Sequence, residues 1–188
     1  MNPVIGFALT GSFCTLEKTF ASIALLKEEY DILPIVSESV AHTDTRFYPK
    51  EAVLSTLTNL CGTPPLKSIA EAEPLGPQNK TDLLVVCPCT GNTLTKLSLG
   101  ITDTSVTMAV KSHRRAGKPV LIALSTNDAL SGSAVSIARL LDKKGFFFVP
   151  FRQDAPQDKP FSLQSDFSLL PDAIRAALDF RQLQPLLR

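Results

Sequence analysis

Four short segments rich in hydroxyl, amide and glycine residues each follow an apolar run, and they are the parts of this chain best suited to bind a small anion. Small residues let the backbone approach a ligand. A helix that begins just after such a segment adds free N–H groups and the positive end of its dipole. A phosphate or a carboxylate would suit that chemistry. The segments are residues 10–15, 37–47, 87–96 and 125–133.

The first segment places a hydroxyl, a glycine and a second hydroxyl, Thr10, Gly11 and Ser12, just before a predicted helix. This arrangement is typical of a loop that binds a phosphate at a helix N-terminus. The full dinucleotide fingerprint of three spaced glycines is missing. An ordinary tight turn with a Ser or Thr cap therefore remains the alternative interpretation.

The second segment opens with Ser37 and contains one arginine, Arg46. A guanidinium can bind a carboxylate or phosphate through two parallel hydrogen bonds, so Arg46 is a candidate substrate-binding residue. The alternative is a surface arginine paired with Asp44 or Glu38. The neighbouring His42 is only a weak candidate, because a single histidine is more often structural or solvated than catalytic.

The third segment is the densest polar stretch of the chain and leads directly into a predicted helix. Thr90, Asn92 and Thr93 could donate hydrogen bonds to an anionic or heteroaromatic ligand, and Gly91 would permit close approach. The fourth segment contains Ser125, Thr126, Asn127 and Asp128. We expect Asn127 and Asp128 to point into the same crevice.

For the fourth segment the alternative is a capping cluster, since Asp, Ser and Asn all favour helix N-caps. Four polar segments at one edge of a sheet are less easily explained as four independent caps.

Five short apolar runs predict the strands that position these segments: residues 4–9, 32–36, 83–87, 120–124 and 146–149. Stretches with a period near 3.6 alternate with them and predict helices over residues 16–30, 49–60, 94–99, 106–116, 131–144 and 170–183. This alternation indicates a doubly wound, Rossmann-like α/β fold, a parallel sheet with helices on both faces. We expect one domain over residues 1–188, with ligands at the carboxyl ends of its strands. Residues 151–168 are predicted to form a long loop that serves as a lid or contacts a ligand or another chain.

Composition excludes several classes of function. Lys and Arg number 19 against 18 Asp and Glu, so a net charge of +1 gives no reason to expect nucleic-acid or membrane-surface binding. No apolar run reaches the roughly 18–20 residues of a membrane span, and no signal pattern opens the chain, so we expect a cytoplasmic protein. The cysteines, Cys14, Cys61, Cys87 and Cys89, lack the spacing of a metal or redox motif. We predict free thiols and no metal site, with Cys87 and Cys89 inert rather than nucleophilic.

The third segment and its continuation resemble the flavoprotein superfamily that includes flavin-dependent cysteine decarboxylases and flavin prenyltransferases. Residues 10–12 also match that superfamily's first phosphate-side loop, and Asn127 stands where the decarboxylases carry a motif asparagine. Two departures are that Thr126 replaces a methionine and that a Gly-rich, Cys-containing lid is missing, which disfavours cysteine decarboxylation. The residues of the third segment that carry the resemblance are Pro88, Asn92, Thr93, Lys96, Gly100 and Asp103.

This resemblance implies FMN as the cofactor and assigns roles to residues of all four segments. Asn92 and Asn127 would be catalytic, and Arg46 and Asn127 would bind the substrate. The cofactor-binding residues would be Thr10, Gly11, Ser12, Ser37, Pro88, Thr90, Gly91, Asn92, Thr93, Ser125 and Thr126.

Within that superfamily the whole chain is similar to the dipicolinate synthase B family of spore-forming bacteria. The matching stretches are residues 6–12, 43–47, 72–77, 90–92, 125–130 and 150–154. The resemblance implies an oxidoreductase subunit in the mother-cell cytoplasm during sporulation. It would act with the A subunit of dipicolinate synthase, which carries NADP, and would convert hydroxy-tetrahydrodipicolinate, a small dicarboxylate, to dipicolinate (pyridine-2,6-dicarboxylate). It also implies a homo-oligomer. The alternatives are a non-catalytic chain that binds a ligand or stabilises its partner, and an FMN-dependent decarboxylase.

Overall fold

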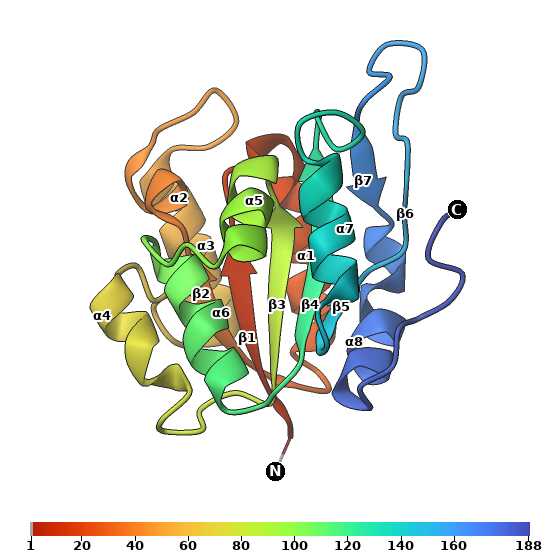
Figure 1. Cartoon of the computed structure of the whole chain (residues 1–188). Coiled ribbons are helices and arrows are strands. Elements are labelled where there is room, and N and C mark those ends of the chain that lie inside the picture. Colours follow the sequence, from red (N-terminus) through yellow and green to blue (C-terminus); the bar gives the residue numbers. More distant parts are fainter. Residues whose placement is uncertain (1) are drawn as a thin grey trace.

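A seven-stranded sheet forms the centre of the computed structural model, which describes residues 2–188 (Figure 1). The strand order is β2-β1-β3-β4-β7-β6, with β5 also paired to β4. The pairs among β1 to β5 are parallel, and the order reverses between β1 and β3. All five apolar runs are strands, as the sequence predicts. The strands are β1 Val4–Leu9, β2 Asp31–Val36, β3 Leu83–Cys89, β4 Val120–Thr126, β5 Phe146–Phe148, β6 Phe151–Arg152 and β7 Leu163–Ser165.

Helices cover both faces of this sheet, which confirms the doubly wound α/β class (Figure 1). Residues of α1, α3 and α8 pack in one core, and residues of α5, α6 and α7 pack in the other. The helices are α1 Leu16–Leu26, α2 Glu38–His42, α3 Lys50–Cys61, α4 Ile69–Ala72, α5 Gly91–Leu99, α6 Ser105–Arg115, α7 Ala134–Asp142 and α8 Leu170–Leu178, with 3-10 turns at Phe13–Thr15, Glu73–Leu75 and Phe167–Leu169.

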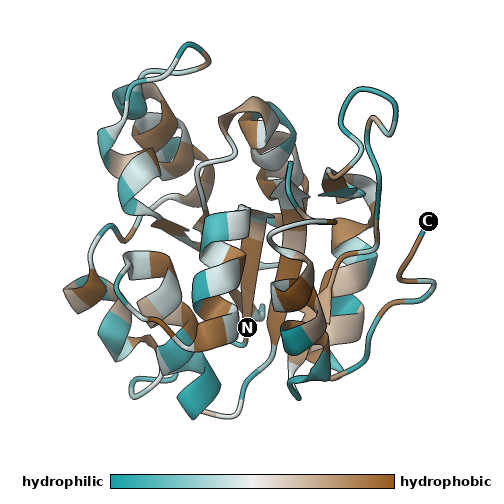
Figure 2. Ribbon diagram, turned by 45° about the horizontal axis from the view of Figure 1, so that its top comes forward, coloured by the Kyte–Doolittle hydropathy of each residue, from teal (hydrophilic) through white to brown (hydrophobic). Residues whose placement is uncertain are grey.

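The continuous apolar strands follow from burial on both faces. Phe7 and Val85 face the core under α1, α3 and α8, whereas their neighbours Ala8 and Val86 face the other core, and all four are fully buried. A strand covered on both faces needs apolar residues at every position. The strands are accordingly hydrophobic along their length, while hydrophilic residues gather in the loops around them (Figure 2).

Three predicted helices extend too far. Residues 27–30 form a turn before β2, so α1 ends at Leu26. The carbonyl of Asp128 accepts hydrogen bonds from the N–H groups of Ser131 and Ser133, and these turns delay the start of α7 to Ala134. Phe180 adopts a left-handed backbone (φ 55°) that terminates α8 before residue 183.

Residues 151–168 are not the irregular loop that the sequence suggests. Strands β6 and β7 form an antiparallel hairpin that adds to the end of β4 through the pairs Ser125–Gln164 and Thr126–Leu163. The sheet is therefore mixed at this edge rather than wholly parallel. The connecting loop, residues 153–162, rises beyond the carboxyl ends of the parallel strands, as does the loop after α2 (Figure 1).

Short backbone pairings cover both outer strands of the sheet. On β2, Leu66 donates to the carbonyl of Pro34 and accepts from the N–H of Val36, each at 2.9 Å. On β6, Phe151 donates to the carbonyl of Leu186 at 3.0 Å and accepts from the N–H of Arg188 at 3.2 Å. Among the described helices, none combines the length and apolar character that crossing a membrane demands.

Candidate functional site

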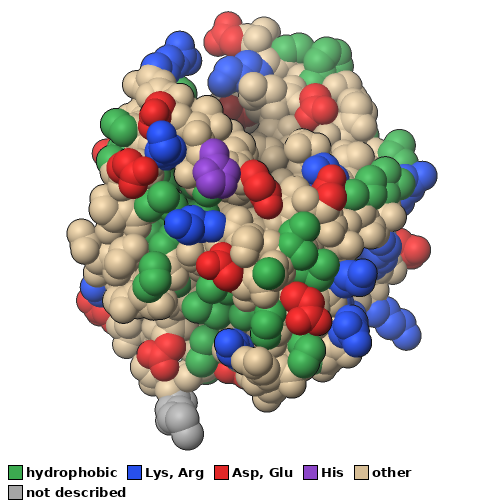
Figure 3. Space-filling model, turned by 90° about the vertical axis from the view of Figure 1, so that its left-hand side faces the viewer, with side chains coloured by type: hydrophobic (Ala, Val, Ile, Leu, Met, Phe, Trp, Pro, Cys, Tyr) green, Lys and Arg blue, Asp and Glu red, His purple; other side chains and the backbone are tan. Residues whose placement is uncertain are grey.

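A cavity of about 600 Å³ opens where the carboxyl ends of β1 and β4 meet the β6–β7 hairpin, and we call it the edge cavity. It brings together residues from all four polar segments, which lie far apart along the chain. Charged side chains border the hollow at the top of the molecule in the side view of Figure 3. The lining residues are Gly11, Ser12, Phe13, Cys14, Arg46, Phe47, Thr90, Ser125, Thr126, Asn127, Asp154, Lys159, Ser162, Leu163 and Gln164.

Two hydroxyl groups of the first segment tie neighbouring strands together at this cavity. The Thr10 hydroxyl is buried, donates to the carbonyl of Pro88 at 2.7 Å and accepts from the N–H of Thr90 at 3.0 Å. The Ser12 and Ser125 hydroxyls are hydrogen-bonded at 2.8 Å. The loops after β1, β3 and β4 are thus held in one arrangement, with Thr10 behind the cavity and Ser12 in its wall.

The backbone of the first segment supplies hydrogen-bond donors to the cavity. Ser12 N–H donates to the carbonyl of Thr10 at 2.7 Å. Within residues 2–188, the N–H groups of Gly11, Phe13 and Cys14 donate to no protein acceptor. Free backbone N–H groups gathered in one turn can donate to an anion. A phosphate is therefore one ligand that these three donors could bind, and the sequence-based hypothesis of a phosphate loop stays a prediction.

Arg46 also lines the cavity and makes no ion pair within the described chain. Its guanidinium lies 4.9 Å from the centre of the Phe47 ring. The alternative pairings are not formed: Asp44 binds Lys50 at 3.2 Å, and Glu38 accepts from a backbone N–H of α6. An exposed cation stacked on an aromatic ring is consequently available to an anionic ligand.

The third segment contributes less of the cavity wall than the sequence suggests. Thr90 lines the cavity and caps α5 by accepting from the N–H of Thr93, which is itself buried. Asn92 lies on the first turn of α5, is exposed and does not line the cavity. Ser12 and Asn127 are thus brought together, and Asn92 stands apart from them.

Gly91 has a packing role rather than the role of admitting a ligand. A Cβ atom at this position would lie 2.6 Å from Asp128 Oδ1, 2.6 Å from Ser133 Oγ and 2.8 Å from Thr126 Oγ1. Asp128 accepts hydrogen bonds from the hydroxyls of Thr126 and Ser133 and does not line the cavity. For Asp128 the expectation of a shared crevice is therefore wrong. The capping alternative does not describe it either, because its carboxylate binds two hydroxyls and the N-cap residue of α7, Ser133, makes no side-chain capping bond.

The remaining candidates of the sequence analysis lie beside the cavity. Ser37 is buried and its hydroxyl is hydrogen-bonded to that of Ser39 at 3.0 Å, while Pro88 is buried and contributes its carbonyl to Thr10. His42 is exposed and does not line the cavity.

All four cysteines are free thiols, as predicted. Burial raises the pKa of Cys87 and of Cys89 far above the ordinary thiol value, which keeps both protonated and unreactive. Cys14 differs from them, because it is exposed and lines the cavity. The sequence places Cys14 in the polar segment 10–15 and Cys87 at the end of the apolar run 83–87, in agreement with this difference in burial.

The β6–β7 hairpin provides a wall that the sequence analysis missed. Asp154 and Lys159 face the cavity with 4.0 Å between their charged groups, and the Ser162 hydroxyl donates to Asn127 Oδ1 at 3.5 Å. Gln164 completes this wall from β7. The only signal was the polar character of residues 151–168, which favoured a contact segment without identifying its members.

Known flavoproteins are similar to this chain over most of its length. The family model described as Flavoprotein matches residues 1–151. The B subunit of dipicolinate synthase from Bacillus subtilis is 42% identical over 184 residues, which cover 97% of this chain and 92% of that protein. The chain belongs to the dipicolinate synthase B family of flavoproteins.

Solved structures extend this family relationship to three dimensions. The crystal structure of the dipicolinate synthase B subunit from Bacillus halodurans superposes with a TM-score of 0.91 at 38% identity, covering 100% of this chain and 98% of that one. The FMN-dependent cysteine decarboxylase SpaF gives a TM-score of 0.65 at 19% identity, covering 95% and 96% of the two chains, which shows a shared fold.

The residues of the edge cavity are compatible with the phosphate group of a flavin mononucleotide. The free N–H groups of Gly11, Phe13 and Cys14 and the Ser12 hydroxyl match the acceptor oxygens of a phosphate. The volume of the edge cavity, about 600 Å³, falls within the usual range for sites that hold a cofactor or small molecule.

Proposed function

We propose that this chain is the B subunit of a dipicolinate synthase and acts with the nicotinamide-dependent A subunit of that enzyme. Together they would convert hydroxy-tetrahydrodipicolinate to dipicolinate through loss of water and transfer of two electrons to NADP on the A subunit. The observation that carries the proposal is the 42% identity to the Bacillus subtilis protein over nearly the full length of both chains. The role would be exercised in the mother-cell cytoplasm during sporulation.

The edge cavity is the proposed ligand site of this chain. Gly11, Phe13 and Cys14 would hold the phosphate of FMN through their N–H groups, with Ser12, Ser125 and Thr126 beside it. Bound FMN would supply the capacity to accept or donate an electron pair. The proposal also includes Thr10, Ser37, Pro88, Gly91 and Thr93 as residues that shape this site from behind.

Arg46 and Asn127 are the proposed substrate-binding residues. The guanidinium of Arg46, which lies 4.9 Å from the centre of the Phe47 ring, would bind one carboxylate of the substrate. The Asn127 carboxamide accepts from Ser162, which leaves its NH₂ group free to donate to the ligand and orient it. Orientation of the substrate in this way is the catalytic role we assign to Asn127.

Asn92 can contribute to the proposed site only if a second chain completes that site. It is exposed at the same end of the sheet but outside the edge cavity of its own chain. A catalytic role for Asn92 therefore requires a site completed by a second protomer or by the A subunit. We include a homo-oligomer in the proposal for this reason.

A reconstitution assay tests the proposal. The isolated A subunit, the isolated chain described here and their mixture would be supplied with hydroxy-tetrahydrodipicolinate and NADP, and the ultraviolet absorption of dipicolinate would be followed. We expect product at full rate only in the mixture, and a flavin spectrum in the purified chain or after addition of FMN.

Asn127→Ala should reduce turnover while the complex with the A subunit still forms. Arg181→Gln is the matched control, because Arg181 is a surface residue paired with Asp179 and lies outside the edge cavity. Full turnover by the isolated A subunit would instead support a non-catalytic role for this chain. Decarboxylation of a cysteine-terminated peptide by this chain alone would support the decarboxylase alternative.

A further inference from the structure

A groove of about 380 Å³ lies between α5, α6 and the start of β5, on the helix layer that covers one face of the sheet. We call it the basic groove. Its apolar lining comes from Leu97 and Val110, which belong to the core beneath, and from Phe146, which packs against that core. The basic groove shares no lining residue with the edge cavity, and no step of the proposed function uses it.

Three cations line the basic groove, and all of them come from the last turns of α6: Lys111, Arg114 and Arg115. None of the three forms an ion pair with a carboxylate of residues 2–188. Among the described residues, no Asp or Glu lines the groove. The net charge of the whole chain is only +1, so this groove is a local concentration of positive charge, which attracts an acidic partner.

Arg114 is held in a fixed position at the end of the basic groove. Its guanidinium donates to the carbonyl of Lys118 and, at 2.9 Å, to the carbonyl of Lys144, and it lies 5.6 Å from the centre of the Phe146 ring. Carbonyl groups accept hydrogen bonds but do not neutralise the charge. The positive charge of Arg114 therefore stays beside the apolar lining, where a carboxylate of another chain can pair with it.

Exposed apolar side chains extend the surface beyond the three cations. Ile101 lines the basic groove, and Leu99 lies two residues before it at the end of α5; both side chains are exposed. Exposed apolar surface beside charged residues is typical of sites at which another protein packs. The combination suits a protein segment with apolar side chains and carboxylates better than it suits a small inorganic anion.

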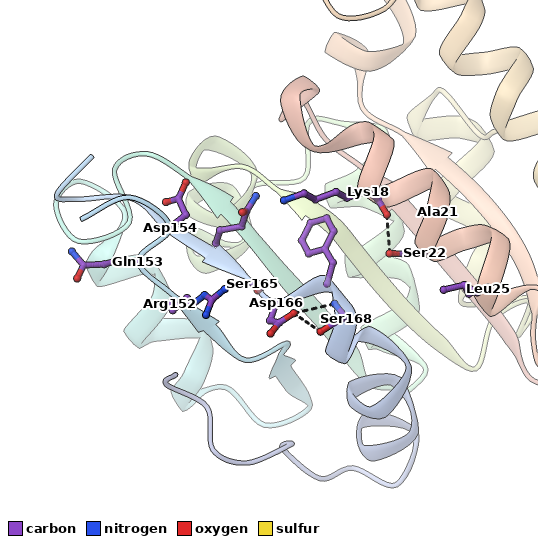
Figure 4. A pocket seen from close by; sticks show the side chains of 12 residues that line it. Lys18, Ala21, Ser22, Leu25, Arg152, Gln153, Asp154, Ser165, Asp166 and Ser168 are labelled. Atoms are coloured by element: carbon purple, nitrogen blue, oxygen red, sulfur yellow. Dashed lines mark hydrogen bonds between the residues drawn. The ribbon is translucent and has the colours of Figure 1, made fainter. Parts of the chain in front are cut away.

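A cavity of about 660 Å³ between α1 and the β6–β7 hairpin differs from the basic groove in its charges (Figure 4). Lys18 and Arg152 line that cavity together with Asp154 and Asp166. Opposite charges in one space compensate one another, so the cavity has no clear preference for an anionic or a cationic partner. The basic groove has cations alone and therefore does have such a preference.

We propose that the basic groove is a docking site for the A subunit and receives an acidic segment of that chain. Apolar side chains of the segment pack on Ile101 and Phe146, and its carboxylates pair with the three cations of α6. This inference rests on the proposed function, because that function supplies the partner chain. Backbone pairings on β2 and β6 oppose contacts through the outer strands, which favours a helical face for this association.

Direct binding of the purified A subunit to the full chain, measured on a biosensor, tests the proposal. Reversal of two charges in Lys111→Glu with Arg115→Glu, the groove variant, should weaken binding at least about tenfold, because like charges across a contact repel. Ile101→Ser should weaken binding about threefold or more through loss of apolar contact. Added salt should weaken the binding of the wild type more than that of the groove variant.

A control variant separates the groove from a general effect of charge. Arg139→Glu with Arg181→Glu reverses the same number of charges at exposed positions outside the groove and should leave the affinity unchanged. In the reconstitution assay, the groove variant should need about tenfold more A subunit to reach half of the maximal turnover. At saturating A subunit its turnover should equal that of the wild type, because the edge cavity is intact.

Equal affinity of the wild type and the groove variant for the A subunit would overturn the proposal, and so would an equal loss in the control variant. Analytical ultracentrifugation of the isolated chain adds a third arm. Loss of self-association in the groove variant with unchanged binding of the A subunit would assign the groove to a second copy of this chain and contradict the proposal. Binding of the A subunit without formation of dipicolinate would contradict the proposed function alone, since the biosensor needs no turnover.

Discussion

The polar groups at the two ends of the parallel strands differ in whether they have partners within the protein. At the amino end, the buried His113 has both ring nitrogens engaged: Nδ1 with the Thr81 hydroxyl at 2.9 Å and Nε2 with the carbonyl of Pro119 at 2.8 Å. Since a carbonyl can only accept, Nε2 carries the proton and Nδ1 accepts from Thr81. Both polar atoms of this side chain therefore have hydrogen-bond partners within the protein.

At the carboxyl end, by contrast, donors and a cation remain available. The N–H groups of Gly11, Phe13 and Cys14 have no acceptor within the described chain, and Arg46 has no carboxylate partner there. A protein leaves such groups unpaired at little cost only where water or a ligand can reach them. The comparison indicates that substitutions at the amino end should change stability, whereas substitutions at the carboxyl end should change ligand binding or turnover.

The largest expected effect is a pH dependence of stability caused by His113. Burial, the main cause, lowers the pKa of His113 from 6.5 to about 4. As the pH falls, His113 therefore binds a proton near pH 6.5 in the unfolded chain but only near pH 4 in the folded chain. The free energy of unfolding should fall by about 3 kcal/mol as the pH is lowered through that window.

Urea unfolding at a series of pH values measures this effect. His113→Gln is the matched variant, because its amide can still donate and accept but does not titrate. Its stability should lack this pH-dependent component. A wild-type slope that persists unchanged in His113→Gln would show that other groups cause the dependence.

Thr10 sharpens the comparison. It lies at the carboxyl end of the strands, but its hydroxyl is buried and hydrogen-bonded within the protein, like His113 at the amino end. Thr10→Val keeps the shape and leaves the N–H of Thr90 without its buried acceptor. We expect a loss of about 2 kcal/mol in the free energy of unfolding, measured in urea. Thr10→Ser retains the hydroxyl and should recover most of the loss. Wild-type stability in Thr10→Val would mean that this hydroxyl does not hold the loops together.

Substitution of Arg46 tests whether the unpaired groups at the carboxyl end of the strands serve to bind a ligand. Arg46→Gln should lower turnover in the reconstituted enzyme about tenfold, because a charge-assisted contact to a carboxylate is lost. Its urea midpoint should stay at the wild-type value, since the side chain makes no ion pair within the described chain. Arg46→Lys retains the charge without the planar fork and should fall between the two. A strongly destabilised Arg46→Gln would contradict the comparison.

The smallest expected effect concerns Asp82 at the amino end. It accepts from the N–H of Val4 at 2.8 Å and from Lys118 at 3.2 Å, and these contacts hold the pKa of its carboxyl below the usual value. The stabilisation is present at neutral pH and is lost as the pH falls through the lowered pKa. Because the group is largely exposed, Asp82→Asn should cost less than about 1 kcal/mol at pH 7. Turnover should not change, and a clear loss of turnover would break the comparison.

The sequence predicted the parallel part of the fold because its central strands β1, β3 and β4 are buried on both faces and leave clear apolar runs, as in residues 83–87. It predicted the segments at the carboxyl ends for the same reason, since the ends of such runs locate the ligand edge. Ser12, Arg46 and Asn127 from three separate segments do line one cavity.

The sequence could not predict the hairpin wall. β6 has two residues and β7 three, too short for any alternating pattern to stand out. β7 depends on pairing with the distant strand β4, and β6 depends on pairing with β7. The packing role of Gly91 could not be predicted either, because the side chains around it, Asp128 and Ser133, lie far along the chain. Asn92 appeared to belong with its neighbours, but the helical turn rotates it away from the cavity.

The backbone pairings on the two outer strands have a practical consequence for anyone who handles this protein. Leu66 and residues 186–188 occupy positions at which a neighbouring chain could otherwise pair with β2 or β6, so these contacts oppose strand-to-strand pairing between copies at those positions. Arg188 also lies 3.9 Å from Asp166. Deletion of residues 186–188 would therefore expose the backbone edge of β6 and remove a cation from beside the Asp166 carboxylate.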